Sequence, residues 1–116
     1  MKNYPEIGKN FMAGSKELAK AEPETMKAFK SLMIATSAKD GALSHKTKEM
    51  IALALGIAAR CDGCIAHHLH ECIEAGVTRE ELVEVIGVCQ LMGGGPSTVF
   101  GADALMAYDQ FMAEKG

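Results

Sequence analysis

The chain has 116 residues, of which 48% are hydrophobic and only 5% are aromatic, and it contains no tryptophan. This length predicts a single domain, residues 1–116, with an adequate but small core. The formal charge of −3 arises from interspersed acidic and basic residues that form no basic stripe, which excludes nucleic acid as an expected partner.

Export and membrane insertion are not expected. No block of Lys or Arg precedes an apolar run near the first residue, so a signal peptide is not predicted. The longest apolar-rich stretch, Met50–Ala59, is far shorter than the roughly 20 residues that span a bilayer. We therefore expect a cytoplasmic protein with no membrane partner, in which closely spaced cysteines indicate redox catalysis or metal binding.

The first half of the chain predicts three helices and no strand. The first runs from about Pro5 to Lys20, and the second begins at Pro23, a first-turn position that tolerates proline. Asp40-Gly41 marks a turn, after which Ser44 is a suitable N-cap for a third helix, His45 to about Ala59. Beyond Glu49 this third helix is apolar nearly all round, which predicts burial on every side.

The second half predicts two or three further helices. A break at Arg60–Gly63 opens the fourth helix, and Gly76 is expected as its left-handed C-cap. Thr78 and Glu81 form a capping box for the fifth helix. The run Gly93–Pro96 ends that helix, and a last helix follows from about Ser97 to Ala113. We therefore predict an all-α, compact bundle of five to six helices.

The glycine run Gly93–Gly95 before Pro96 has two interpretations. It could cradle a phosphate, but no G-K-[S/T] follows it and no strand precedes it. We favour a tight helix–helix corner at which backbones approach closely.

The strongest chemical pattern is Cys61-Asp62-Gly63-Cys64. Three residues apart on a helix, the two sulfurs share one face and lie within bonding reach. Because the helix is expected to start at about Cys61, free N–H groups and the helix dipole favour the nucleophilic thiolate. Redox chemistry is the favoured interpretation, and a merely structural thiol pair remains open. A zinc site also remains open, with further ligands drawn from His67, His68, His70, Cys72 and Cys89.

Two further residues are candidates for proton transfer. His68 follows Cys64 by four residues on the same helix face, and imidazole is a suitable proton acceptor near neutral pH. We expect His67 and His70 to lie on the flank or surface. Glu49 precedes the most apolar stretch and is either exposed at the helix end or buried with a partner. The sequence alone favours exposure.

The remaining candidates have no predicted chemistry. Cys72 and Cys89 lie among apolar neighbours and are expected to be small buried hydrophobes. The eight methionines are interpreted as core residues. Asp103 and Tyr108, on the last helix, have no identifiable role.

Glu49, Cys61, Cys64 and His68 together form the pattern E-x11-C-x2-C-x3-H. This pattern resembles the carboxymuconolactone decarboxylase superfamily, and within it the alkylhydroperoxidase D-like branch. Three segments look like family segments as well: Ser44–Glu49, Glu74–Glu81 and Leu91–Pro96. The resemblance covers about residues 25 to 110.

The resemblance implies an oligomeric all-α bundle, a trimer or hexamer, with the active site near a subunit contact. It further implies a peroxiredoxin-type oxidoreductase that needs no cofactor and no metal. Its catalytic residues are Cys64, Cys61, His68 and Glu49, with the carboxylate and imidazole relaying protons. The implied partners are a small hydroperoxide and a dithiol reductant or peroxiredoxin protein.

One departure counts against full peroxidase efficiency, because the branch carries a further histidine before the second cysteine, where this chain has Gly63. Two rival functions stay open. One is a decarboxylase or isomerase that uses His68 and Glu49 as acid and base, although the decarboxylase branch typically lacks the cysteine pair. The other is a non-catalytic zinc or interaction module.

Overall fold

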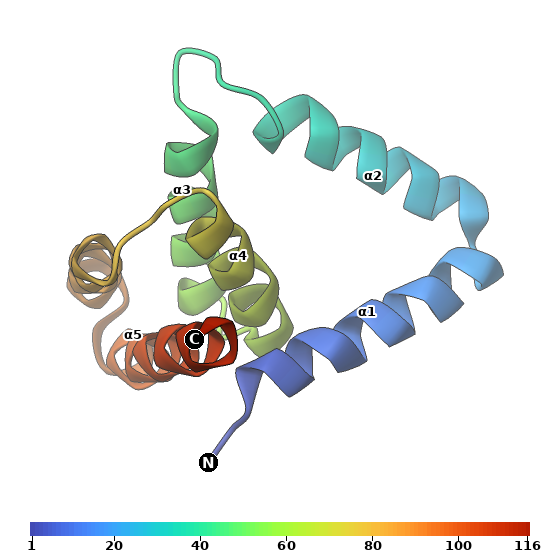
Figure 1. Cartoon of the computed structure of the whole chain (residues 1–116). Coiled ribbons are helices and arrows are strands. Elements are labelled where there is room, and N and C mark those ends of the chain that lie inside the picture. The colour runs from blue at the N-terminus through green and yellow to red at the C-terminus, as the bar shows by residue number, and fades with distance from the viewer.

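The computed structural model describes all 116 residues and contains five helices and no strand, which confirms the all-α prediction. The helices are α1 (Tyr4–Ala21), α2 (Pro23–Ser37), α3 (His45–Ala58), α4 (Asp62–Glu74) and α5 (Arg79–Lys115). Figure 1 shows α3 and α4 side by side with α5 below them, and α1 and α2 extending to one side.

Capping residues set several helix ends where the sequence predicted them. The Ser44 hydroxyl accepts a hydrogen bond from Thr47 N–H at 3.0 Å, at the start of α3. Thr78 and Glu81 form the reciprocal capping box of α5, with bonds of 3.1 and 2.9 Å. Gly76 follows α4 with φ of 90°, a conformation that glycine adopts without steric cost. These three predictions are confirmed.

α5 bends sharply at Gly94, where φ is 66° and ψ is −142°. The bend falls in the predicted glycine run, so the direction of the chain changes where a helix end was expected. The neighbouring Gly93 packs so closely that a Cβ there would lie 1.9 Å from Ser97 Oγ. The run is therefore a tight helix–helix corner.

α5 is longer than the apolar stretch singled out in the sequence. By length and composition alone it is the one helix that could cross a membrane, which is weak evidence. Side chains on both sides of its bend, among them Leu82, Ile86 and Ala104, pack into the core of the bundle.

The core lies where α3, α4 and α5 meet, and the first turn of α1 closes it. Its largest fully buried side chains are Tyr4, Leu53, Ile57, Ile65, Leu69, Leu82 and Cys72. The expectation that α3 is buried on every side is wrong. Ile51 and Leu55 are 45% and 65% exposed, because α4 and α5 cover only the face that carries Glu49, Leu53 and Ile57.

α1 and α2 form an arm beside this core. α2 contacts α1 and α3 but neither α4 nor α5, and none of its residues is buried. Phe29, Leu32 and Ile34 of α2 are 56%, 55% and 60% exposed. The apolar pattern of this helix therefore has no partner within a single chain.

Candidate active site

The turn between α3 and α4 places the two cysteines at a helix start. Arg60 adopts a left-handed conformation, with φ of 56°, and so reverses the chain after α3. The N–H of Cys61 then donates to the carbonyl of Gly56 at 3.1 Å, which ties the turn that carries the cysteines to the end of α3.

Cys61 is the N-cap of α4 and is joined to Cys64 by a disulfide, with a Cα–Cα distance of 5.2 Å. The sulfur of Cys61 also accepts a hydrogen bond from Cys64 N–H at 3.2 Å, as an N-cap side chain does. Both residues are half-buried. The free N–H groups of the first turn of α4, together with the positive end of the helix dipole, would stabilise a thiolate after reduction.

Gly56 allows α3 to approach this pair closely. A Cβ on Gly56 would lie only 3.1 Å from Cys64 Cβ, so a larger residue would press against the second cysteine. The sequence analysis missed Gly56, because a glycine in an apolar helix does not reveal which neighbour it faces.

Glu49 is buried beside His68, which corrects the expectation that it is exposed. Its side chain is 5% exposed, and its Oε2 lies 3.0 Å from Nδ1 of His68, whose side chain is 26% exposed. Glu49 begins the buried face of α3, and α4 crosses that face. A buried carboxylate needs such a partner.

The bond through Nδ1 leaves Nε2 of His68 as the ring atom that can exchange protons with a sulfur or a water. His68 follows Cys64 by one helical turn, so the pair shares a face of α4. Glu49 therefore contacts His68, and His68 shares a helix face with Cys64.

The other two histidines differ from each other. His67 is half-buried between the rings of His68 and Phe11, at centroid distances of 4.8 and 6.1 Å, rather than on the open surface. Burial and the neighbouring His68 lower the pKa of His67, so it favours the neutral form. His70 is exposed, as expected.

Cys72 and Cys89 are free and buried, which confirms the prediction of small buried hydrophobes. Burial, reinforced by the charges of Glu49 and Glu71, raises the pKa of Cys72 to about 12. In this disulfide form, no group of three or more His, Cys, Asp or Glu side chains is arranged to hold a metal ion.

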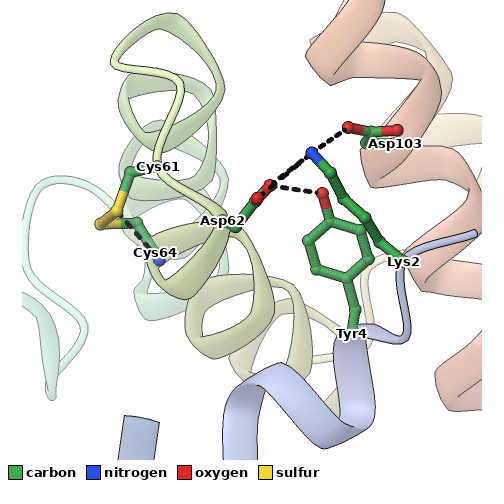
Figure 2. A network of polar contacts seen from close by, with 6 residues as sticks. All are labelled: Lys2, Tyr4, Cys61, Asp62, Cys64 and Asp103. Carbon is green, nitrogen blue, oxygen red and sulfur yellow. Dashed lines mark hydrogen bonds and ion pairs between the residues drawn. A yellow bond between two sulfur atoms is a disulfide. The ribbon is translucent and has the colours of Figure 1, made fainter. Parts of the chain in front are cut away.

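A second polar group lies at the turn that carries the cysteines, and the sequence did not predict it. Asp62, between the cysteines, bonds to Lys2 and Tyr4, and Lys2 also pairs with Asp103 (Figure 2). Asp103, for which no role was expected, is therefore part of a network. Separations of 58 to 101 residues made these contacts invisible in the sequence.

The structure is an all-α bundle with a CxxC pair at the start of α4. Comparison with known proteins identifies the family to which this class of protein belongs. A sequence model of the carboxymuconolactone decarboxylase family matches residues 23–107, most of the chain. The protein belongs to the carboxymuconolactone decarboxylase family, and the site is compatible with the alkylhydroperoxidase D-like branch.

Three individual proteins are similar to this chain over most or more than half of its length. An uncharacterised protein of Cupriavidus necator, H16_B0147, is 37% identical over 93% of this chain and 91% of its own length. An uncharacterised protein from the cox locus of Paracoccus denitrificans is 34% identical over 61% of this chain and 64% of its own. The crystal structure of apo-lpg0406, a carboxymuconolactone decarboxylase family protein from Legionella pneumophila, superposes with a TM-score of 0.89. It is 44% identical and covers 93% of this chain and 96% of its own.

Proposed function

We propose that this protein is a thiol-dependent oxidoreductase that reduces hydroperoxides or partner disulfides through Cys61 and Cys64. The observation that carries the proposal is the arrangement of the cysteine pair, His68 and Glu49. A cysteine pair at the start of α4 lies one helical turn from a His68 side chain that a buried Glu49 holds at 3.0 Å. Thiolate formation and proton delivery, the two requirements of peroxide reduction, are both served by these groups.

The first step oxidises one cysteine. With both cysteines reduced, His68 accepts the proton of Cys64, and Glu49 stabilises the resulting imidazolium. The thiolate attacks the terminal oxygen of the hydroperoxide, and the O–O bond breaks. The alkoxide that leaves takes a proton from the imidazolium, giving an alcohol and a Cys64 sulfenic acid.

The second step closes the disulfide. The Cys61 sulfur, whose thiolate the Cys64 N–H and helix start favour, attacks the Cys64 sulfur and displaces hydroxide, which is protonated to water. An external dithiol then reduces the disulfide by thiol–disulfide exchange and is itself oxidised. When the substrate is a protein disulfide, the reduced Cys61–Cys64 pair donates the two electrons by thiol–disulfide exchange.

The wider setting follows from this chemistry. The electrons pass through cysteines, so no cofactor is required, and a reducing compartment such as the cytoplasm keeps the pair active. The partners are a small hydroperoxide and a dithiol reductant or peroxiredoxin protein. A homo-oligomer, trimer or hexamer, would cover the exposed apolar faces. Gly63 in place of a histidine favours slow peroxide turnover or a disulfide substrate.

A lyase is the second candidate, because the His68–Glu49 pair is an acid–base unit that does not depend on the sulfurs. Such an enzyme would keep its activity on a small carboxylate when both cysteines are replaced by serine.

The test measures hydroperoxide consumption with excess dithiol. Cys64→Ser and Cys61→Ser should each retain less than about a tenth of the wild-type rate, equivalent to more than ~1.4 kcal/mol of barrier. The matched control, Cys89→Ala, removes a buried thiol elsewhere and should retain the wild-type rate. Substantial turnover in either serine variant would refute the paired-thiol mechanism.

A further inference from the structure

The carboxylate between the two cysteines is held by the N-terminal segment. Tyr4 Oη donates to Asp62 Oδ1 at 2.7 Å, and Lys2 Nζ lies 3.2 and 3.1 Å from the two carboxylate oxygens. Figure 2 shows the disulfide on one side of the turn and the Asp62 side chain directed to the other, toward Lys2 and Tyr4.

This segment is itself anchored from several directions. Tyr4 is 0% exposed, and its N–H donates to the Gln110 side chain, whose amide in turn donates to the Lys2 carbonyl. Lys2 Nζ also pairs with Asp103 at 2.9 Å and lies 4.7 Å from the ring centre of Phe100. Contacts of backbone, ring and charge therefore fix one position of the Lys2 ammonium.

The charge of Asp62 opposes the chemistry of its neighbours. Asp62, the first residue of α4, stands between the two cysteines in the chain, and a carboxylate near a cysteine that must form a thiolate disfavours that thiolate because like charges repel. A cation on that carboxylate offsets this repulsion. Asp103 and Asp62 hold the pKa of Lys2 above its usual value, so the ammonium stays charged wherever a thiolate forms.

We propose that Lys2 and Tyr4 are positioning residues for the redox pair: they hold the Asp62 carboxylate away from the sulfurs and offset its charge, and so keep the cysteines reactive. Burial raises the pKa of Tyr4 above its usual range, which keeps its hydroxyl a neutral donor to Asp62. The inference deepens the proposed function, since it concerns the reactivity of the same dithiol.

Other charged groups near the turn also affect how readily a thiolate forms. Glu49 of α3 and His68 and His67 of α4 lie on the inner side, and Arg60 precedes the pair. None of these contacts Asp62. Substitutions of Lys2, Tyr4 and Asp62 leave all of these groups in place. A change in thiol reactivity therefore reports the contacts of Lys2 and Tyr4 with Asp62.

The experiment records the alkylation rate of the fully reduced protein against pH with iodoacetamide, which requires no peroxide. Lys2→Met should raise the midpoint for the Cys61–Cys64 pair by about half a pH unit, a slowing of about three-fold below the midpoint. Tyr4→Phe should move it the same way by less. Asp62→Asn should lower it, and Lys2→Met added to Asp62→Asn should change nothing more.

The matched control is Arg79→Met, which breaks the Arg79–Asp109 ion pair. This pair is also partly exposed but has no contact with the turn that carries the cysteines. The control should leave the pH profile of alkylation unshifted. A Lys2→Met profile that overlays wild type, or an equal Lys2→Met shift in the Asp62→Asn background, would overturn the inference. Circular dichroism verifies folding of each variant. A wild-type protein that reduces neither hydroperoxides nor a protein disulfide would defeat the proposed function and leave this result intact.

Discussion

At the scale of single residues, the proposed function predicts that the Glu49–His68 pair controls how readily Cys64 loses its proton. Glu49→Gln keeps the shape of the side chain but removes the charge that stabilises the imidazolium. The midpoint of Cys64 alkylation against pH should rise by about one unit. His68→Gln should also raise this midpoint. The double variant should raise it by less than the sum of the two single shifts, because coupled residues are non-additive.

An unshifted Glu49→Gln profile beside a shifted His68→Gln profile would remove Glu49 from the site. Circular dichroism of both variants provides the control, since the carboxamide could also disturb packing around a buried position.

The sequence predicted a site of Glu49, Cys61, Cys64 and His68, but only the family pattern raised Glu49 above an exposed position. Local periodicity shows that Glu49 begins an apolar stretch. It does not show that α4 crosses α3 at that point and supplies His68, 19 residues away in the chain. The contacts of Asp62 were unpredictable for the same reason, since its partners Lys2 and Tyr4 lie 60 and 58 residues away in the chain.

The buried thiol of Cys72 gives a pH dependence of stability. Burial raises its pKa from the ordinary 9.0 to about 12 in the folded protein. Below pH 9 both states are protonated. Between pH 9 and about 12 the unfolded chain loses the proton first, so the free energy of unfolding falls by up to about 1.4 kcal/mol per unit.

Urea unfolding of oxidised wild type and Cys72→Ala at pH 7.5 and 10.5 measures this effect. The variant should be less stable by about 1 kcal/mol at the lower pH, because it loses buried sulfur contacts. That difference should shrink or reverse at the higher pH. A constant difference would mean that Cys72 does not resist ionisation.

At the scale of elements, the bend of α5 depends on one glycine. Gly94 has a φ of 66°, and no atom lies within 4 Å of its hypothetical Cβ, so the cost of a side chain is one of backbone conformation alone. Gly94→Ala should therefore destabilise the protein by about 1–2 kcal/mol in urea unfolding.

Gly95→Ala is the matched control, because its Cβ also meets open space and its φ is not positive. It should be neutral or stabilising by up to about 1 kcal/mol, since alanine favours helix. Equal effects of the two substitutions would contradict the strained-corner explanation.

Helix boundaries were predictable because their causes are local. Ser44, the Thr78–Glu81 box and Gly76 act through hydrogen bonds or backbone angles within a few residues. The burial of whole helices was not predictable. The apolar patterns of α2 and of the outer side of α3 require partners that the chain itself does not supply.

At the scale of the whole molecule, these open faces predict self-association. Only 19 of 116 residues are buried, and Phe29, Leu32, Ile34 and Leu55 are each more than half exposed. Apolar surface of this kind is unfavourable in water and is covered in oligomers. Light scattering at micromolar concentration should return three or six times the mass of one chain, and Phe29→Glu with Leu32→Glu should lower it. A wild-type mass of a single chain would refute this prediction.

The central claim is that Cys61 and Cys64 together carry two electrons to a peroxide. Its most direct test is a thiol count under denaturing conditions on protein that has been reduced and handled anaerobically. All 4 cysteines should be titratable at first. One equivalent of an organic hydroperoxide should remove two thiols per chain, and a dithiol should restore both. Four thiols persisting after the hydroperoxide would contradict the account.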